Sequence, residues 1–222
     1  MDKTVLSGVK TIYFDFDGTL HDTVKIYGES LRIGFKYMID QGMDYFSIPT
    51  DEEAVKWLGY NAPEMWLKLL PDEHDEFRLK VSKMVGQHMN EMLRTGKGSL
   101  YKGAKEVLET LKKRGYTLIY LSNCKNVYRE AVVKAYNIGH LFDAQFCSES
   151  FDFIPKEEII KKVRHYFPEE QIVIGDRFHD MKAAKKNNLN SIFCKYGYGQ
   201  MEEGQTATLT IDSVDEILEI LD

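Results

Sequence analysis

Four carboxylates fall into two pairs, each beside a glycine at the end of a short apolar run. Asp15 and Asp17 precede Gly18 in the segment DFDGTL, and Asp176 and Asp180 lie in GDRFHD. Carboxylates can attack an electrophile, exchange protons or hold a hard cation such as Mg²⁺. Because Asp-Gly is also a common turn pair, the first segment alone predicts either a reactive site or a turn.

The spacing of the first pair allows the two acids to have different chemical roles. Side chains two residues apart on a strand share a face, but one that stands directly before a glycine turn can swing away. Asp15 and Asp17 would then supply one carboxylate that attacks and one that exchanges protons.

Two further segments offer groups that suit a phosphate. Ser122 and Asn123 follow an apolar run and provide a hydroxyl and backbone N–H groups where a helix is predicted to begin, a favourable position for an anion. Such residues are also frequent helix N-caps. Lys156 follows Pro155 at the opening of another helical pattern, either as a mobile positive charge for the site or as a surface lysine.

The elements that must position these residues belong to an α/β fold. Short apolar runs without alternation predict buried parallel strands at residues 11–16, 116–121, 172–174 and 191–194. Helical patterns lie between the later runs, for example over residues 104–113 with Gly115 just beyond. Parallel strands present their carboxyl ends at one edge, where ligands bind, so the chemical groups are expected to meet there.

Residues 21–96 interrupt this alternation with helical spacing and no convincing strand. Leu31, Phe35 and Met38 recur at one helical face, and residues 77–92 predict a longer amphipathic helix. We therefore predict a helical cap, residues 21–96, inserted into a catalytic core of residues 1–20 and 97–222. The aromatic and polar loop at residues 56–61 is the segment expected to approach a leaving group.

Composition excludes several classes of protein. The net charge of −6 gives no electrostatic reason to bind nucleic acid or an anionic membrane. The three cysteines fit neither a disulfide framework nor a zinc site, and no apolar run reaches the length of a signal core or membrane span. A cytoplasmic protein is predicted, with monomer and homodimer both open.

Taken in order, the segments resemble the four motifs of the haloacid dehalogenase-like hydrolase superfamily. The first is DFDGT, followed by Ser122, by Lys156, and by Asp176 with Asp180. A helical insertion directly after the first motif is similar to the branch of phosphoglycolate phosphatase and beta-phosphoglucomutase. The resemblance implies a Rossmann-like core beneath a helical cap, a small phosphorylated metabolite as substrate, and Mg²⁺ as cofactor.

The resemblance also implies roles for single residues. Asp15 would be the nucleophile that becomes phosphorylated, and Asp17 the acid and base, oriented by Thr19. The implied metal site comprises the Asp15 carboxylate, the Asp17 backbone carbonyl, Asp176 and, in support, Asp180. The transferring phosphate would contact Lys156 and the groups around Gly18, Thr19, Ser122 and Asn123.

Other activities remain open at this point. A phosphomutase, a pyrophosphatase or a non-catalytic phosphometabolite sensor would share these motifs, whereas Asp17 argues against a dehalogenase and against hydrolysis of phosphonoacetaldehyde. Arg177, His179 and Cys124 are assigned no catalytic role.

Overall fold

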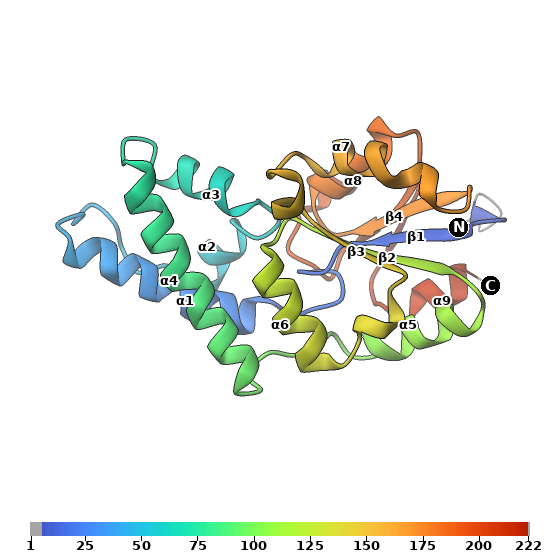
Figure 1. The fold of residues 1–222 in the computed structure, drawn as a ribbon, viewed down its shortest axis with the longest axis horizontal. Coiled ribbons are helices and arrows are strands. Elements are labelled where there is room, and N and C mark those ends of the chain that lie inside the picture. The colour runs from blue at the N-terminus through green and yellow to red at the C-terminus, as the bar shows by residue number, and fades with distance from the viewer. Residues whose placement is uncertain (1–5, 222) are drawn as a thin grey trace.

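A parallel sheet runs through the larger part of the molecule (Figure 1). The computed structural model describes residues 6–221, so residues 1–5 and 222 of the predicted core lie outside it. Within that range the strand order is β3-β2-β1-β4-β5-β6, and every pairing is parallel. The strands are β1 (Thr11–Phe14), β2 (Thr117–Ser122), β3 (Ala144–Cys147), β4 (Gln171–Gly175), β5 (Asn190–Cys194) and β6 (Leu209–Ile211).

The four predicted strands correspond to β1, β2, β4 and β5, which confirms the α/β class. Strands β3 and β6 were not predicted from the sequence. Both lie at the edges of the sheet, β3 is mostly half-buried and β6 has three residues, so neither shows a continuous apolar run.

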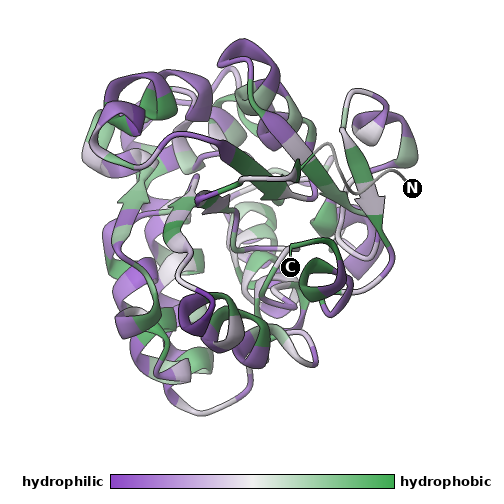
Figure 2. Ribbon diagram, turned by 90° about the vertical axis from the view of Figure 1, so that its right-hand side faces the viewer, coloured by the Kyte–Doolittle hydropathy of each residue, from purple (hydrophilic) through white to green (hydrophobic). Residues whose placement is uncertain are grey.

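Helices cover both faces of the sheet, which explains why its strands are apolar on both sides. On one face α5 (Ala104–Lys113), α6 (Asn126–Tyr136) and α9 (Glu216–Ile220) pack against Ile12 and Phe14. On the other, α7 (Lys156–Val163) and α8 (Phe178–Lys186) pack against Tyr13. Figure 2 shows hydrophobic stretches in the strands between helices with hydrophilic outer turns. None of the helices within residues 6–221 has both the length and the apolar character needed to cross a membrane.

Four helices inserted between β1 and α5 form a unit at the end of the molecule where the strands have their carboxyl ends (Figure 1). They are α1 (Val24–Asp40), α2 (Asp51–Val55), α3 (Ala62–Leu69) and α4 (Asp75–Arg94). Leu31, Phe35 and Met38 of α1 are buried against this unit's own apolar cluster, which includes Trp66 and Val85.

The helical unit leaves and rejoins the core at adjacent points. The N–H of Tyr101 donates to the carbonyl of Leu20 at 2.9 Å, and the N–H of Asp22 donates to the carbonyl of Ser99 at 3.0 Å. The two connecting segments therefore lie side by side.

Candidate active site

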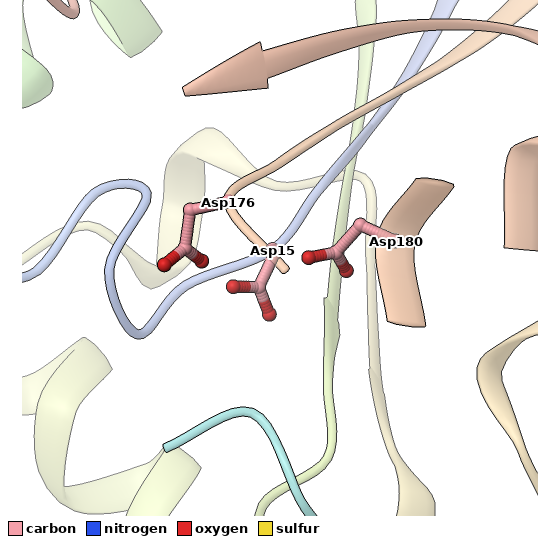
Figure 3. Close-up of side chains that lie close together, drawn as sticks. All are labelled: Asp15, Asp176 and Asp180. Atoms are coloured by element: carbon pink, nitrogen blue, oxygen red, sulfur yellow. The ribbon is translucent and has the colours of Figure 1, made fainter. Parts of the chain in front are cut away.

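Three buried carboxylates meet at the carboxyl ends of the two central strands. Asp15 directly follows β1, Asp176 follows β4, and Asp180 lies in the first turn of α8. One oxygen from each lies within 4.8 Å of the others. Figure 3 shows the three side chains gathered in one region between the strand ends. Their exposed fractions are 5%, 0% and 1%, so little water screens their charges.

Lys156 supplies a buried positive charge to this cluster. It is the first residue of α7, as the sequence predicts, and its Nζ lies 2.6 Å from Asp15 Oδ1 and 2.6 Å from Asp180 Oδ1. Burial lowers the pKa of the Lys156 ammonium, but the charges of Asp15 and Asp180 outweigh burial and raise that pKa above its usual value. The lysine is therefore charged and fixed between two carboxylates.

A single ammonium leaves the cluster with excess negative charge. Burial raises the pKa of the Asp15 carboxyl to about 7, against the opposing charge of Lys156. Burial and then the charges of Asp15 and Asp180 raise the pKa of Asp176 well above its ordinary value. Such shifts mark a site where a further cation would stabilise the ionised carboxylates.

The surroundings of Asp176 fit a hard cation with oxygen ligands. Gly18 has φ +89°, and a Cβ there would lie 2.3 Å from Asp176 Oδ2. A Cβ at Gly197 would lie 2.3 Å from Asp176 Cβ and 2.5 Å from the Gly18 carbonyl oxygen. Because both residues are glycines, no side chain occupies the space beside the Asp176 carboxylate, whose oxygens are suitable ligands for Mg²⁺.

Asp17 lies apart from this cluster and has its own partners. Its Oδ1 accepts hydrogen bonds from Thr23 Oγ1 at 2.7 Å and from Tyr128 Oη at 2.7 Å. Of the four residues predicted to hold metal, the structure therefore brings together the carboxylates of three. The Asp17 carboxylate instead lines a neighbouring cavity that Asp15 also lines.

Thr19 does not orient Asp17, so that prediction is wrong. Its hydroxyl lies 3.4 Å from Asp15 Oδ2 and 3.4 Å from Asp176 Oδ1, because the Gly18 turn directs it back to the strand ends. The N–H groups of Gly18 and Thr19 donate to the carbonyls of His21 and Phe16 at 3.0 and 3.2 Å. These amides, predicted to bind phosphate, already have partners within the turn.

Ser122 and Asn123 lie where the sequence predicts, at the end of β2, and both line the cavity with Asp15 and Asp17. Helix α6 begins only at Asn126, so neither residue belongs to its first turn, contrary to expectation. Asn123 Nδ2 donates to the Gly59 carbonyl at 2.7 Å, whereas its buried Oδ1 has no partner within residues 6–221.

The cavity has a volume of about 140 Å³ and its far wall comes from the helical unit. Residues 57–60 of the predicted loop line it, together with polar and apolar side chains of α3 and α4. Gly59 adopts φ +94°, a conformation that favours glycine. The predicted loop therefore lines the same cavity as Asp15 and Asp17. Further lining residues are Tyr27, Met65, Trp66, Ser82, Val85, Met89, Asn90 and Lys125.

Thr23 and Tyr128, the partners of Asp17, were not predicted from the sequence. Tyr128 lies 111 residues further along the chain, on α6, and only the tertiary fold brings it to Asp17. Thr23 follows the first motif closely, but a threonine before a helix is usually a cap and carries no signal of its own.

Comparison with known proteins agrees with this geometry. The family described as haloacid dehalogenase-like hydrolase matches residues 12–194, which include the acids, Ser122 and Lys156. The chain belongs to the haloacid dehalogenase-like hydrolases. The predicted resemblance is therefore confirmed.

Several of these hydrolases are similar over nearly the whole chain. The glyceraldehyde 3-phosphate phosphatase of Pyrococcus furiosus is 27% identical over 228 residues, covering 96% of this chain and 93% of the relative. The phosphoglycolate phosphatase of Aliivibrio fischeri is 25% identical, covering 87% of each chain. A crystal structure described as a predicted phosphoglycolate phosphatase from Haemophilus somnus has a TM-score of 0.82 at 23% identity, covering 96% of this chain and 98% of that one. The last comparison confirms the Rossmann-like fold.

Proposed function

We propose that this phosphoric monoester hydrolase is a Mg²⁺-dependent phosphatase that cleaves small phosphomonoesters through a phosphorylated Asp15. The observation that carries the proposal is the separation of two carboxylates along one cavity. Asp15 is held by Lys156 at the strand ends, whereas Asp17 is held by Thr23 and Tyr128. This arrangement supports one acid as nucleophile and the other as proton carrier.

In the first step an Asp15 oxygen attacks phosphorus, the new O–P bond forms, and the bond to the alcohol oxygen breaks. Asp17 donates its proton to that oxygen as it leaves. The approach of two anions is opposed by about 4 kcal/mol per pair of unit charges at 4 Å and an effective dielectric constant near 20. Lys156, bonded to Asp15, offsets part of this repulsion.

Bound Mg²⁺ would supply a second positive charge that screens the nucleophile from the phosphate. Asp15 and Asp176 would hold it, with the Asp17 backbone carbonyl as a further oxygen ligand. Asp180 would act in support, because one of its oxygens already accepts from Lys156 and the other accepts from the Arg177 N–H at 3.1 Å.

In the second step water attacks phosphorus, the Asp15–phosphate bond breaks, and inorganic phosphate leaves. Asp17, now ionised, takes the proton from the attacking water. Thr23 and Tyr128 keep its carboxylate in place through both steps, while Ser122, Asn123 and Lys156 would bind the phosphate oxygens.

The helical unit supplies the other wall of the cavity, which supports its role as the predicted cap. We place the cap at residues 21–96 and the core at residues 1–20 and 97–222. The leaving group of a small phosphorylated metabolite would lie between them. Phosphoglycolate and glyceraldehyde 3-phosphate are the first substrates to try, because two similar proteins are named for them.

The test is phosphate release from these esters, sugar phosphates, nucleotides and pyrophosphate, with Mg²⁺ or EDTA. Wild type should turn over at least one ester only with Mg²⁺, and Asp15→Asn should lose at least about 10³-fold in kcat. Asp212→Asn is the matched control, since Asp212 has 74% of its side chain exposed and pairs with Lys195.

Four results would contradict the proposal. Phosphate release that persists in EDTA would exclude a requirement for Mg²⁺. Equal rates for Asp15→Asn and wild type would exclude Asp15 as the nucleophile. If wild type releases no phosphate but interconverts sugar phosphates with a bisphosphate present, the enzyme is a mutase; binding without any turnover indicates a sensor.

A further inference from the structure

Arg177 lies directly after the carboxylate Asp176, yet its side chain reaches a distant segment of the chain. It is 6% exposed, and its Nη1 donates to the carbonyl of Leu58 in the loop between α2 and α3. Its Nε lies 3.0 Å from Glu203 Oε2. One arginine thus joins the turn that carries the metal-site acids to the loop that forms the cavity wall.

The loop packs closely on this arginine. A Cβ at Gly59 would lie 2.8 Å from Arg177 Cγ, so the backbone of the loop lies against the arginine side chain without room for another atom. The Tyr60 ring lies 5.9 Å from the guanidinium carbon and 4.9 Å, edge-on, from the His179 ring. The contact therefore extends over three consecutive loop residues, 58–60.

Glu203 fixes the arginine from the core side. Its Oε2 accepts from Arg177 Nε and also from the N–H of Phe178 at 2.7 Å, at the start of α8. A carboxylate held at two points keeps the guanidinium aimed at the loop. The geometry depends on the planar fork of arginine, because a lysine presents one point charge and cannot copy two directed N–H groups.

A second core residue holds the next carbonyl of the loop. Asn123 Nδ2 donates to the Gly59 carbonyl at 2.7 Å, so the carbonyls of residues 58 and 59 are bound by Arg177 and Asn123 respectively. Arg177 directly follows the proposed site residue Asp176, and Asn123 is itself a proposed site residue. The loop is thereby placed relative to the reacting groups and not only relative to the helical unit.

We propose that Arg177 is a positioning residue that fastens residues 57–60 over the catalytic edge and so forms the wall against which the leaving group packs. The kinetic part of this inference rests on the proposed phosphatase function, whereas the structural part, that Arg177 holds the loop in place, does not. Without the arginine, Trp57 and Tyr60 would lose their fixed place beside the cavity. Large leaving groups would lose a contact surface, whereas the smallest would not.

The first experiment measures hydrogen exchange of the backbone amides in residues 57–60 without substrate. Arg177→Met should accelerate exchange in that segment by about tenfold, the expected result of losing a charged hydrogen bond, and Arg177→Lys should lie closer to wild type. Exchange in the strands should not change. Arg94→Met is the matched control, because Arg94 is 73% exposed and pairs with Glu91 on the surface of α4. Unchanged exchange at 57–60 in Arg177→Met would overturn the proposal.

The second experiment compares p-nitrophenyl phosphate, whose leaving group is large, with acetyl phosphate, whose leaving group is small. For Arg177→Met, kcat/KM should fall by about 10- to 100-fold with the large ester, mainly through a higher KM, and by less than about threefold with acetyl phosphate. Equal losses for both compounds would overturn the proposal, because Arg177 would then act only on the acids beside it.

The role of Arg177 can still be tested if the variant does not fold or if neither compound is hydrolysed. If Arg177→Met does not fold, Glu203→Gln removes the charge that aims the guanidinium and should give the same pattern in weaker form. Normal exchange and kinetics of Glu203→Gln would then overturn the proposal. If wild type hydrolyses neither compound, the exchange measurement alone decides the role of Arg177, and the phosphatase proposal is decided separately by its own panel of esters.

Discussion

The strand ends and the helical wall of the cavity differ in how fully their polar groups are satisfied. At the strand ends, Asp15 and Asp180 accept from Lys156, and the N–H of Tyr198 donates to Asp176 at 2.6 Å. On the opposite side, the buried Oδ1 of Asn90 has no partner among the described residues. The carboxylates at the strand ends therefore have hydrogen-bond partners before substrate arrives, whereas the helical wall, like Asn123 Oδ1 at the end of β2, still has hydrogen-bonding capacity for a ligand.

This contrast assigns different tasks to the two walls. Groups that are fixed in advance stabilise developing charge without reorganisation, which suits the chemical step. A buried acceptor without a partner costs about 1–3 kcal/mol, a cost that a ligand donor removes on binding. Changes at the strand ends should therefore lower kcat, and changes on the helical wall should alter KM for particular esters.

The largest effect is expected from Lys156→Met at the strand ends. Two buried carboxylates would lose their shared counter-charge, so kcat should fall by about 10³-fold or more. Stability should fall by roughly 3 kcal/mol, which lowers Tm by roughly 6 to 12 °C in a chain of this size. Kinetics and thermal unfolding, each with and without Mg²⁺, measure both quantities, and Mg²⁺ should restore part of the stability.

Lys182→Met is the control for this change. Lys182 pairs with Glu157 at 2.7 Å, but half of its side chain is exposed, so its loss should cost less than about 1 kcal/mol. Similar Tm values for the two variants would show that the buried cluster does not depend on its lysine.

A smaller effect at the same edge is expected from Gly197→Ala. The added Cβ would displace Asp176 and should raise the Mg²⁺ concentration for half-maximal activity by about 10-fold or more. Titration of activity against Mg²⁺ measures it. Gly139→Ala is the control, because its Cβ would meet only an ordinary contact at 3.4 Å. Equal Mg²⁺ requirements in both variants would place the metal away from Asp176.

The comparison also explains what the sequence could predict. Acids at the ends of apolar runs are local signals, so Asp15, Asp176 and the strands that carry them were found in advance. Lys156 was predicted as well, because its place at a helix start follows from neighbouring residues. The edge strands β3 and β6 were missed because half-buried or three-residue strands lack the apolar run on which the prediction depends.

What the sequence did not predict depends on tertiary contacts. Tyr128 meets Asp17, and Arg177 meets Leu58, across 111 and 119 residues. Thr19 and Thr23 are equally plausible partners for Asp17 in sequence, and the direction of the Gly18 turn decides between them. No local pattern encodes these pairings, since each requires the position of the helical unit or of α6 relative to the strand ends.

Tyr128→Phe tests whether the fixed position of Asp17 matters. It removes one of two hydroxyl donors at 2.7 Å and retains Thr23, so kcat should fall by about tenfold while KM stays nearly constant. Steady-state kinetics with one ester measure both. Tyr166→Phe, at a side chain that is 73% exposed, should change neither. A rise in KM with unchanged kcat would instead show that Tyr128 contributes to substrate binding and not to the chemical step.

The smallest effect is expected from Asn90→Ala on the helical wall. Removing an unpartnered buried oxygen from α4, where alanine also favours the helix, should leave stability within about 1 kcal/mol of wild type or raise it. If Asn90 accepts from a substrate hydroxyl, KM for a sugar phosphate should rise by about 5- to 10-fold, and KM for p-nitrophenyl phosphate, which has no hydroxyl, should not. The exposed Gln87 on the same helix gives the control variant Gln87→Ala. A matching rise in KM for both esters would mean that Asn90 shapes the cavity without forming a hydrogen bond to the leaving group. The difference between the two walls would then be one of packing alone.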